Sequence, residues 1–215
     1  MANGKWKVMK NKEYSLMINW NYVGISVVVL AILTVMVLYL PTMREIDSTI
    51  LRSIRLALSP FPSYIPIFVS EFGRANQMLW PQITAGCVLV SHRLYLKAFM
   101  LILFTQIAYY LEDLIKEFIC RPRPEGCGIG GYSFPSGHAT TTMCFCGIII
   151  YLIHCYVKSD FWRNFLIIFF GLWIFLTCIA RMWLGAHFLS DILAGLALGF
   201  LLVNVYIIID KSLSR

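Results

Sequence analysis

The chain has 215 residues, of which 59% are hydrophobic and 13% are charged, and its mean hydropathy is +0.74. An ordinary soluble domain has roughly 45–50% apolar and about 25% charged residues, so this composition excludes a soluble globular protein and indicates an integral membrane protein. The formal net charge is +7. We do not interpret it as a sign of nucleic-acid binding, because we expect the excess charge to lie on one face of a membrane.

Six segments meet or approach the length of a membrane span. A hydrocarbon core of about 30 Å requires a helix of about 20 apolar residues. The segments cover residues 22–40, 75–91, 95–111, 137–157, 164–180 and 192–209. Good helix formers continue after the third segment until Pro122 stops them. We therefore expect an all-α polytopic membrane protein, with six transmembrane helices in one bundle and a single domain over residues 1–215.

A short amphipathic helix is predicted between the first two spans. Apolar side chains recur four apart at Ile46, Ile50, Ile54 and Leu58, and arginines lie on other faces. This pattern is typical of a helix that lies in the membrane interface. Two interpretations stay open: the helix caps the bundle, or its arginines attract an anionic lipid.

The loops predict the orientation. With six spans and a cytoplasmic N-terminus, both termini are cytoplasmic and the whole net charge of +7 falls on that side. Counted by lysine and arginine alone, as the positive-inside rule requires, the bias is only 10 to 8. The N-terminal flank contributes basic residues to it: Lys5, Lys7, Lys10 and Lys12. The loops that follow the third and fifth spans then face the other side of the membrane.

Three polar clusters fall on this outer side. The first is Lys116 with Arg123 and Pro124, the second is the sequence "PSGH" at residues 135–138, and the third is Arg181 with His187 and Asp191. Each lies at a membrane border, where a charge is costly. Their shared location indicates one polar site built from separate loops.

The residue types in these clusters suit a phosphate group. Lys116 supplies a point charge, and Arg123 and Arg181 supply planar forks that match phosphate oxygens. Ser136 and Gly137 stand at the start of the fourth span, where free N–H groups and the helix dipole favour an anion. The sequence therefore predicts a phosphate-binding site.

Two histidines are candidates for catalysis. His187 and Asp191 are four apart, so on a helix they share a face, and the carboxylate can fix the tautomer of the imidazole and make it a better nucleophile. His138 is then available to protonate a leaving oxygen. Structural explanations stay open, among them an ion pair of Lys116 with Glu112. His92 and His154 lie at the opposite face, where we expect structural roles.

The three clusters resemble the signature of the type 2 phosphatidic acid phosphatase superfamily. The matching sequences are "KEFICRPRP" from Lys116, "PSGH" from Pro135 and "ARMWLGAHFLSD" from Ala180. Six spans and short loops are similar to its membrane lipid phosphatase branch. One position departs from the pattern, since Ala180 stands where the family usually has serine. We expect activity to survive this loss of one hydroxyl.

The resemblance implies a metal-independent phosphatase without a cofactor. It implies that His187 forms a phosphohistidine, that Asp191 orients it and that His138 is the general acid. It assigns phosphate binding to Lys116, Arg123, Ser136, Gly137 and Arg181. Candidate substrates are phosphatidylglycerol phosphate, undecaprenyl diphosphate, phosphatidic acid and the phosphates of lipid A. The short loops resemble those of a bacterial inner-membrane enzyme whose site faces the periplasm, and an endoplasmic reticulum enzyme with a luminal site would have the same topology.

Three other functions stay open. A lipid phosphotransferase would use the same histidine and pass the phosphoryl group to a lipid instead of water. A metal-dependent hydrolase would use His138, His187 and Asp191 as ligands, although the surrounding cations would repel a divalent metal. An anion or lipid transporter would need the cations but neither histidine. The sequence also allows a disulfide between Cys120 and Cys127 in the outer loop, and it does not predict an oligomeric state.

Overall fold

The computed structural model describes residues 20–71 and 75–213. The basic N-terminal residues Lys5, Lys7, Lys10 and Lys12 lie outside these ranges. Within them the chain forms eight helices: α1 (Trp20–Tyr39), α2 (Pro41–Leu58), α3 (Tyr64–Glu71), α4 (Ala75–Ser91), α5 (Tyr95–Ile119), α6 (Gly137–Tyr156), α7 (Asp160–Trp183) and α8 (Leu189–Leu213). The predicted all-α fold is confirmed.

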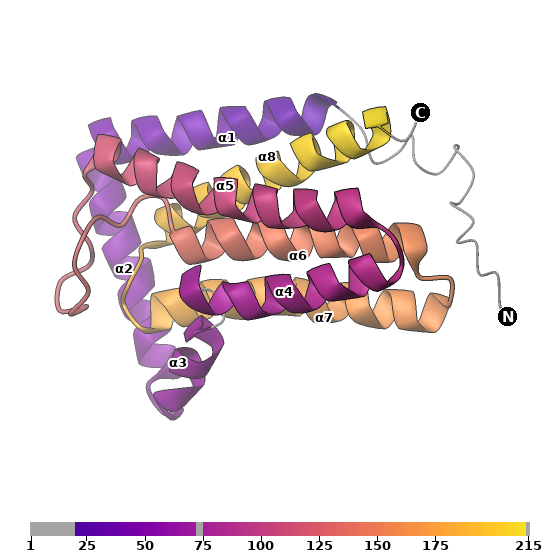
Figure 1. Ribbon diagram of the computed structural model, residues 1–215. Coiled ribbons are helices and arrows are strands. Elements are labelled where there is room, and N and C mark those ends of the chain that lie inside the picture. The colour runs from indigo at the N-terminus through magenta and orange to yellow at the C-terminus, as the bar shows by residue number, and fades with distance from the viewer. Residues whose placement is uncertain (1–19, 72–74, 214–215) are drawn as a thin grey trace, which may run out of the picture.

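The long helices lie side by side in one bundle, and α2 runs across one of its ends (Figure 1). Five helices are long and apolar enough to cross a membrane, namely α1, α5, α6, α7 and α8. The apolar part of α4 is shorter, at Met78–Ser91, so the count of six spans stays a prediction. The sequence pattern did not predict α3, which has only eight residues.

The helix α6 is the centre of the bundle and packs against α5, α7 and α8. Two glycines of α8 permit its close approach to the start of α6. A Cβ atom on Gly195 would lie 2.6 Å from the carbonyl oxygen of Ser136, and one on Gly199 would lie 2.6 Å from that of Thr140. Small residues four apart allow such backbone contacts between membrane helices. They hold the first turns of α6 and α8 together.

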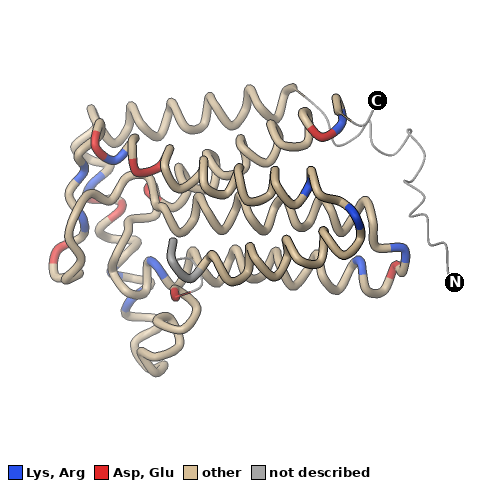
Figure 2. The backbone as a smooth tube through the Cα atoms, in the orientation of Figure 1, with Lys and Arg blue, Asp and Glu red and all other residues tan. Residues whose placement is uncertain are grey.

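Charged residues gather at the two ends of the bundle, whereas the middle of the long helices is almost free of them (Figure 2). The outer faces of α1, α5 and α7 carry many exposed large apolar side chains, for example Ile32, Phe99 and Leu172. In water such a surface would be unfavourable, but lipid chains solvate it well. The distribution fits a bundle whose middle lies in hydrocarbon and whose ends are wet.

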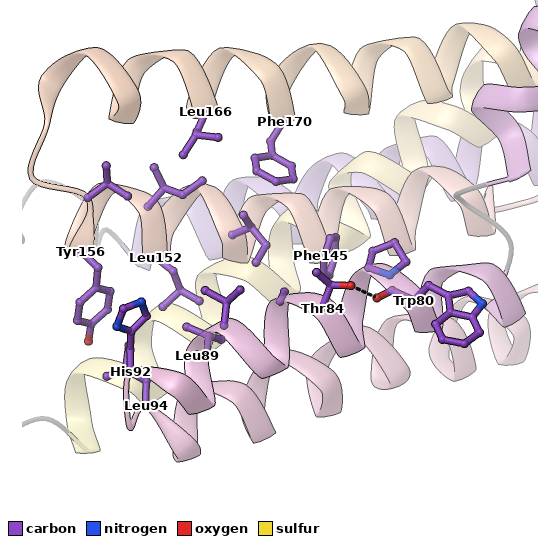
Figure 3. A pocket seen from close by; sticks show the side chains of 16 residues that line it. Trp80, Thr84, Leu89, His92, Leu94, Phe145, Leu152, Tyr156, Leu166 and Phe170 are labelled. Carbon is purple, nitrogen blue, oxygen red and sulfur yellow. Dashed lines mark hydrogen bonds between the residues drawn. The ribbon is translucent and has the colours of Figure 1, made fainter.

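An apolar cavity of about 680 Å³ lies between α4, α6 and α7 (Figure 3). Side chains of Leu89, Phe145, Leu152 and Phe170 line it, and His92 lies near one end. No residue of the three predicted clusters lines it. The cavity therefore offers no group for phosphate chemistry, and the candidate site lies elsewhere.

Candidate active site

The loop between α5 and α6 starts and ends beside the site. Cys120 adopts a left-handed conformation with φ of 51° and ends α5. Pro122 then pairs with Tyr132 in an isolated antiparallel bridge, and the N–H of Ser133 donates to the carbonyl of Arg121 at 2.9 Å. These contacts close the loop on itself, so that its two ends lie together near the first turn of α6.

His187 lies in the turn between α7 and α8. Its Nδ1 is 2.9 Å from the carbonyl oxygen of Ser133, and its Nε2 is 3.2 Å from Nη1 of Arg123. A carbonyl only accepts, so Nδ1 must carry the proton and donate it. The guanidinium only donates, so the Nε2 lone pair faces Arg123. Both contacts select the tautomer whose Nε2 is free of hydrogen, which is the form that a nucleophile needs.

The surroundings keep the ring of His187 neutral. The side chain is almost fully buried, at 1% exposure. Burial lowers the pKa of His187 to about 4; the carboxylate of Asp191 opposes this shift, and the charges of Arg181 and Arg123 add to it. The imidazole is therefore unprotonated at neutral pH.

Asp191 lies close to His187, but it does not accept the hydrogen bond from Nδ1 of the ring. Its Oδ2 is 3.8 Å from Nδ1 of the ring and accepts from the N–H of Phe188 at 2.8 Å. Its Oδ1 accepts from Nη1 of Arg121 at 2.5 Å. The Ser133 carbonyl thus makes the direct contact that we had expected of Asp191. Asp191 supports the ring through its charge and through the backbone of Phe188.

Arg121 joins three segments of the chain. Besides Asp191 it donates to Oγ of Ser190 at 2.7 Å and to Oδ2 of Asp47 at 2.7 Å. Ser190 also donates to Asp47 through its N–H and its hydroxyl. Asp47 belongs to α2, so this buried cluster fixes α2 against the start of α8. We call it the Arg121 cluster, comprising Arg121, Asp47, Ser190 and Asp191.

The predicted cations all lie at this end of the bundle. Arg123 donates to the carbonyls of Gly130 at 3.1 Å and Ala186 at 3.0 Å. Burial lowers its pKa from the ordinary value of 12.5, yet an arginine stays protonated at neutral pH. Arg181 is buried and donates to Oγ of Ser70 at 2.6 Å. This contact brings α3 beside the site.

Lys116 forms an ion pair with Glu112. The carboxylate of Glu112 also lies against the first turn of α6, since a Cβ atom on Gly137 would lie 2.2 Å from its Oε1. Gly137 therefore leaves room at the helix N-terminus, and in this structure a carboxylate fills it. An acidic group at a helix N-terminus is electrostatically favoured. A phosphate at the same place would compete with Glu112 for Lys116.

Ser136 differs from its prediction in one respect. Its backbone N–H is not free, because it donates to the carbonyl of Asp191 at 2.9 Å. Its hydroxyl is fully buried and makes no hydrogen bond within the described part of the chain. Buried hydroxyls usually have a partner. The side chain of Ser136, rather than its backbone N–H, is thus the group without a partner among the described residues.

The remaining predicted residues take the following places. His138 is half-buried in the first turn of α6, and Ala180 is buried near the end of α7. His92 and His154 lie at the opposite end, in the turn after α4 and in the last turn of α6. All seven cysteines belong to the described residues and have free thiols, so the structure contains no bridge between Cys120 and Cys127.

Sequence reasoning missed Arg121, Asp47, Ser133 and Ser190. A carboxylate on the same helical face as Leu51 was a usable signal for Asp47, because a charge on a buried face needs a partner. Ser133 acts through its backbone carbonyl, so its side chain carried no signal.

The chain is similar to known proteins in both sequence and fold. Residues 94–214, more than half of the chain, match the PAP2 superfamily. Phosphatidylglycerophosphatase B of Bacillus subtilis is 24% identical over 199 residues, which cover 90% of this chain and 98% of that protein. The crystal structure of a transmembrane PAP2 type phosphatidylglycerolphosphate phosphatase from Bacillus subtilis superposes with a TM-score of 0.82 at 23% identity, again over 90% and 98% of the two chains. The two chains therefore share a fold.

Another relative matches over a shorter region. Lipid A 4'-phosphatase of Bacteroides thetaiotaomicron is 39% identical over 70 residues, which are 33% of this chain and 28% of that protein.

Proposed function

Because this chain belongs to the PAP2 superfamily, and is a membrane lipid phosphatase by its homology, we propose that it hydrolyses a lipid phosphate monoester through a phosphohistidine on His187. The observation that carries the proposal is the pair of contacts at the ring: Ser133 holds Nδ1, and Nε2 faces Arg123. A phosphate bound by Arg123 would lie beside the one nitrogen that can attack it.

The substrate we propose is phosphatidylglycerol phosphate. The relative that aligns over nearly its whole length is a phosphatidylglycerophosphatase. The lipid A phosphatase aligns over a third of this chain and supports the chemistry more than the substrate. The apolar outer surface of the bundle suits a lipid whose chains stay in the bilayer while its phosphate reaches the polar end.

In the first step the lone pair of Nε2 attacks phosphorus, and the bond between phosphorus and the ester oxygen breaks. Arg123, Arg181, Lys116 and the hydroxyl of Ser136 hold the other phosphate oxygens. His138 gives its proton to the leaving oxygen, which departs as an alcohol. The Ser133 carbonyl and the Asp191 carboxylate stabilise the positive charge that grows on the ring of His187.

In the second step water attacks the phosphohistidine. His138, now neutral, takes a proton from the water, and the bond between Nε2 and phosphorus breaks. Inorganic phosphate leaves, and His187 and His138 return to their starting protonation states. Lys116 pairs with Glu112, so binding of phosphate exchanges one anion for another at Lys116.

The reaction as proposed needs no metal ion. Among the described residues no three His, Cys, Asp or Glu side chains are grouped so that they could hold one. Cations surround His187 instead, and they provide the charge stabilisation that a metal would otherwise supply.

The orientation we propose follows the distribution of charge. α4 crosses the membrane and brings the number of spans to six. Both termini are cytoplasmic. The protein lies in a bacterial inner membrane, and both α2, in the membrane interface, and the site are on the periplasmic side. The mixed character of α2 supports this, since Ile46 and Leu56 are exposed on it alongside arginines.

The proposal can be tested with purified protein in neutral detergent and excess chelator. Phosphate release is measured from phosphatidylglycerol phosphate, phosphatidic acid, undecaprenyl diphosphate and lipid A, for wild type and His187→Ala in parallel. We expect wild type alone to release phosphate, fastest from phosphatidylglycerol phosphate. Transfer of the phosphoryl group to a lipid would indicate a phosphotransferase, and equal release by His187→Ala would refute the assigned nucleophile.

A further inference from the structure

Three arginines of α2 form a second basic site beside His187. Arg44, Arg52 and Arg55 line a pocket of about 560 Å³ together with Pro124, Glu125 and Phe188. Pro124 follows Arg123, and Phe188 follows His187, so the pocket and the candidate active site share a wall. Apart from Pro124, no residue of the three predicted clusters lines it. It is therefore a neighbour of the phosphate site and not part of it.

The periodicity of α2 explains why the arginines gather. Positions 44, 48, 52 and 55 recur at intervals of three or four residues, so their side chains project from one side of the helix. Leu51 and Asp47 are buried next to them and face the bundle. Asp47 accepts from Arg121 and Ser190, so the Arg121 cluster fixes the position of the arginines relative to the catalytic turn.

Arg55 lies closest to that turn. A Cβ atom on Gly185 would lie 3.3 Å from Nη1 of Arg55. Gly185 has φ of 67°, a left-handed conformation that glycine adopts without strain. The guanidinium thus lies over the backbone two residues before His187.

The charges of this pocket are largely unmatched. All three arginines are exposed, and none forms an ion pair with a described residue. Glu125 is the one carboxylate in its lining, so the pocket keeps a net positive charge. Arg121, by contrast, forms ion pairs with Asp47 and Asp191. A basic pocket of this kind suits an oxyanion.

We propose that Arg52 and Arg55, with Arg44 at one end, bind a second phosphate of the substrate while His187 attacks the first. This inference rests on the proposed function and deepens it. Phe188, the neighbour of His187 in the chain, lines the pocket, whereas His187 does not. The two phosphates therefore occupy separate places and must be joined by a spacer. That requirement fits a phosphodiester linked through glycerol to the scissile phosphate. It does not fit a diphosphate, whose two phosphorus atoms share one oxygen.

The test compares three lipids in neutral-detergent micelles: phosphatidylglycerol phosphate, phosphatidic acid and undecaprenyl diphosphate. The variant is the double substitution Arg52→Gln with Arg55→Gln. Because a charge-assisted contact is worth about 1.5–3 kcal/mol, we expect kcat/KM for phosphatidylglycerol phosphate to fall about tenfold more than kcat/KM for phosphatidic acid. An equal fall for all lipids would indicate general attraction of anions and overturn the proposal, as would a fall confined to the diphosphate or no fall at all.

Three further variants sharpen the result. Arg52→Gln combined with Arg55→Lys keeps the charge at position 55, and its loss should be smaller than that of the double glutamine variant. Arg163→Gln removes one positive charge from α7 at the opposite end, where Arg163 pairs with Asp160, and should leave the ratio of the two kcat/KM values at its wild-type value. Glu125→Gln makes the pocket more positive and should lower KM for phosphatidylglycerol phosphate. The subsite would also be refuted if these variants changed kcat/KM or KM for phosphatidylglycerol phosphate in the opposite directions.

Binding of phosphatidylglycerol, which carries only the phosphodiester, separates this inference from the catalytic proposal. The measurement uses His187→Ala with and without the double substitution, in the same micelles. We expect the double substitution to weaken binding about tenfold. Unchanged binding would overturn the subsite even if the phosphatase activity were confirmed, and weaker binding would support it even if no lipid were hydrolysed.

Discussion

The two ends of the bundle each bury an ion pair, but they use it differently. At the end with both α4–α5 and α6–α7 turns, Lys97 of α5 pairs with Asp210 of α8, which also accepts from the hydroxyl of Tyr151 of α6 at 2.9 Å. The cation and the anion of this pair are in direct contact, and the contacts join three helices. At the site end Arg121 likewise meets carboxylates, yet Arg123 beside it binds two carbonyls and a neutral histidine.

The difference shows how a charge becomes available to a ligand. A buried charge is costly unless it is paired, and the Lys97–Asp210 pair is satisfied within the protein. Arg123 receives hydrogen-bond acceptors without a full negative charge, so its positive charge remains to attract an anion. We infer that the Lys97–Asp210 pair stabilises the bundle, whereas the site end is incomplete until phosphate binds.

Of the variants that compare the two ends of the bundle, Arg121→Gln is expected to reduce turnover most. The change leaves the buried carboxylates of Asp47 and Asp191 without their shared cation, which costs roughly 3–5 kcal/mol, and loosens the turn that holds His187. We expect kcat/KM to fall about a hundredfold and Tm to fall as well. Arg121→Lys should rescue little, because one ammonium cannot reproduce a fork that contacts three residues. Wild-type turnover in Arg121→Gln would show that the Arg121 cluster does not position the site.

The pH dependence of kcat/KM tests the neutral state of His187. Its lowered pKa of about 4 means that the unprotonated nucleophile persists until the pH falls through that value. An ordinary histidine with a pKa of 6.5 would lose activity about thirtyfold by pH 5. After correction for ionisation of the substrate phosphate, we expect less than about a twofold loss of nucleophile at pH 5. An acidic limb centred near 6.5 would contradict the effect of burial.

Glu112→Gln should strengthen anion binding. The carboxylate now pairs with Lys116 and lies over Gly137, where it repels an incoming phosphate. The amide keeps the shape and removes the charge. We expect vanadate, which mimics the pentacoordinate phosphoryl group, to inhibit the variant about threefold to tenfold more strongly. Weaker inhibition would mean that Glu112 helps to arrange the phosphate ligands instead of competing with the ligand.

Asp210→Asn should have the smallest effect on turnover. It leaves Lys97 without its charged partner, so we expect Tm to fall and kcat/KM to stay within about twofold of wild type. Thermal unfolding followed in detergent, together with the phosphatase assay, measures both quantities. A large loss of kcat/KM at unchanged Tm would break the contrast between the two ends.

The sequence predicted the long helices well because the length of an apolar run reflects the thickness of the membrane. The expected segment 137–157 became α6 at Gly137–Tyr156, and 192–209 became the core of α8. The sequence did not predict α3, because eight residues in a proline-rich stretch have neither the length of a span nor a clear hydrophobic period.

The sequence predicted which residues lie at the candidate site better than it predicted the contacts between them. Spacing placed Asp191 and His187 on one helical face, but His187 lies in the turn before α8, where the Ser133 carbonyl reaches Nδ1 first. Likewise, helix spacing predicted the pair of Lys116 with Glu112 as an alternative, and that pair is present. Contacts between residues four apart can be read from a sequence. Contacts such as Asp47 with Arg121 depend on how distant segments meet.

The central claim is that His187 carries the phosphoryl group, and trapping the intermediate tests it most directly. Wild-type protein turning over phosphatidylglycerol phosphate is quenched at alkaline pH, where phosphohistidine survives, and its peptides are mapped by mass spectrometry. We predict phosphate on His187 in wild type and none anywhere in His187→Ala, which should also be inactive. Steady turnover by wild type with no phosphorylated histidine, together with activity in His187→Ala, would contradict the account.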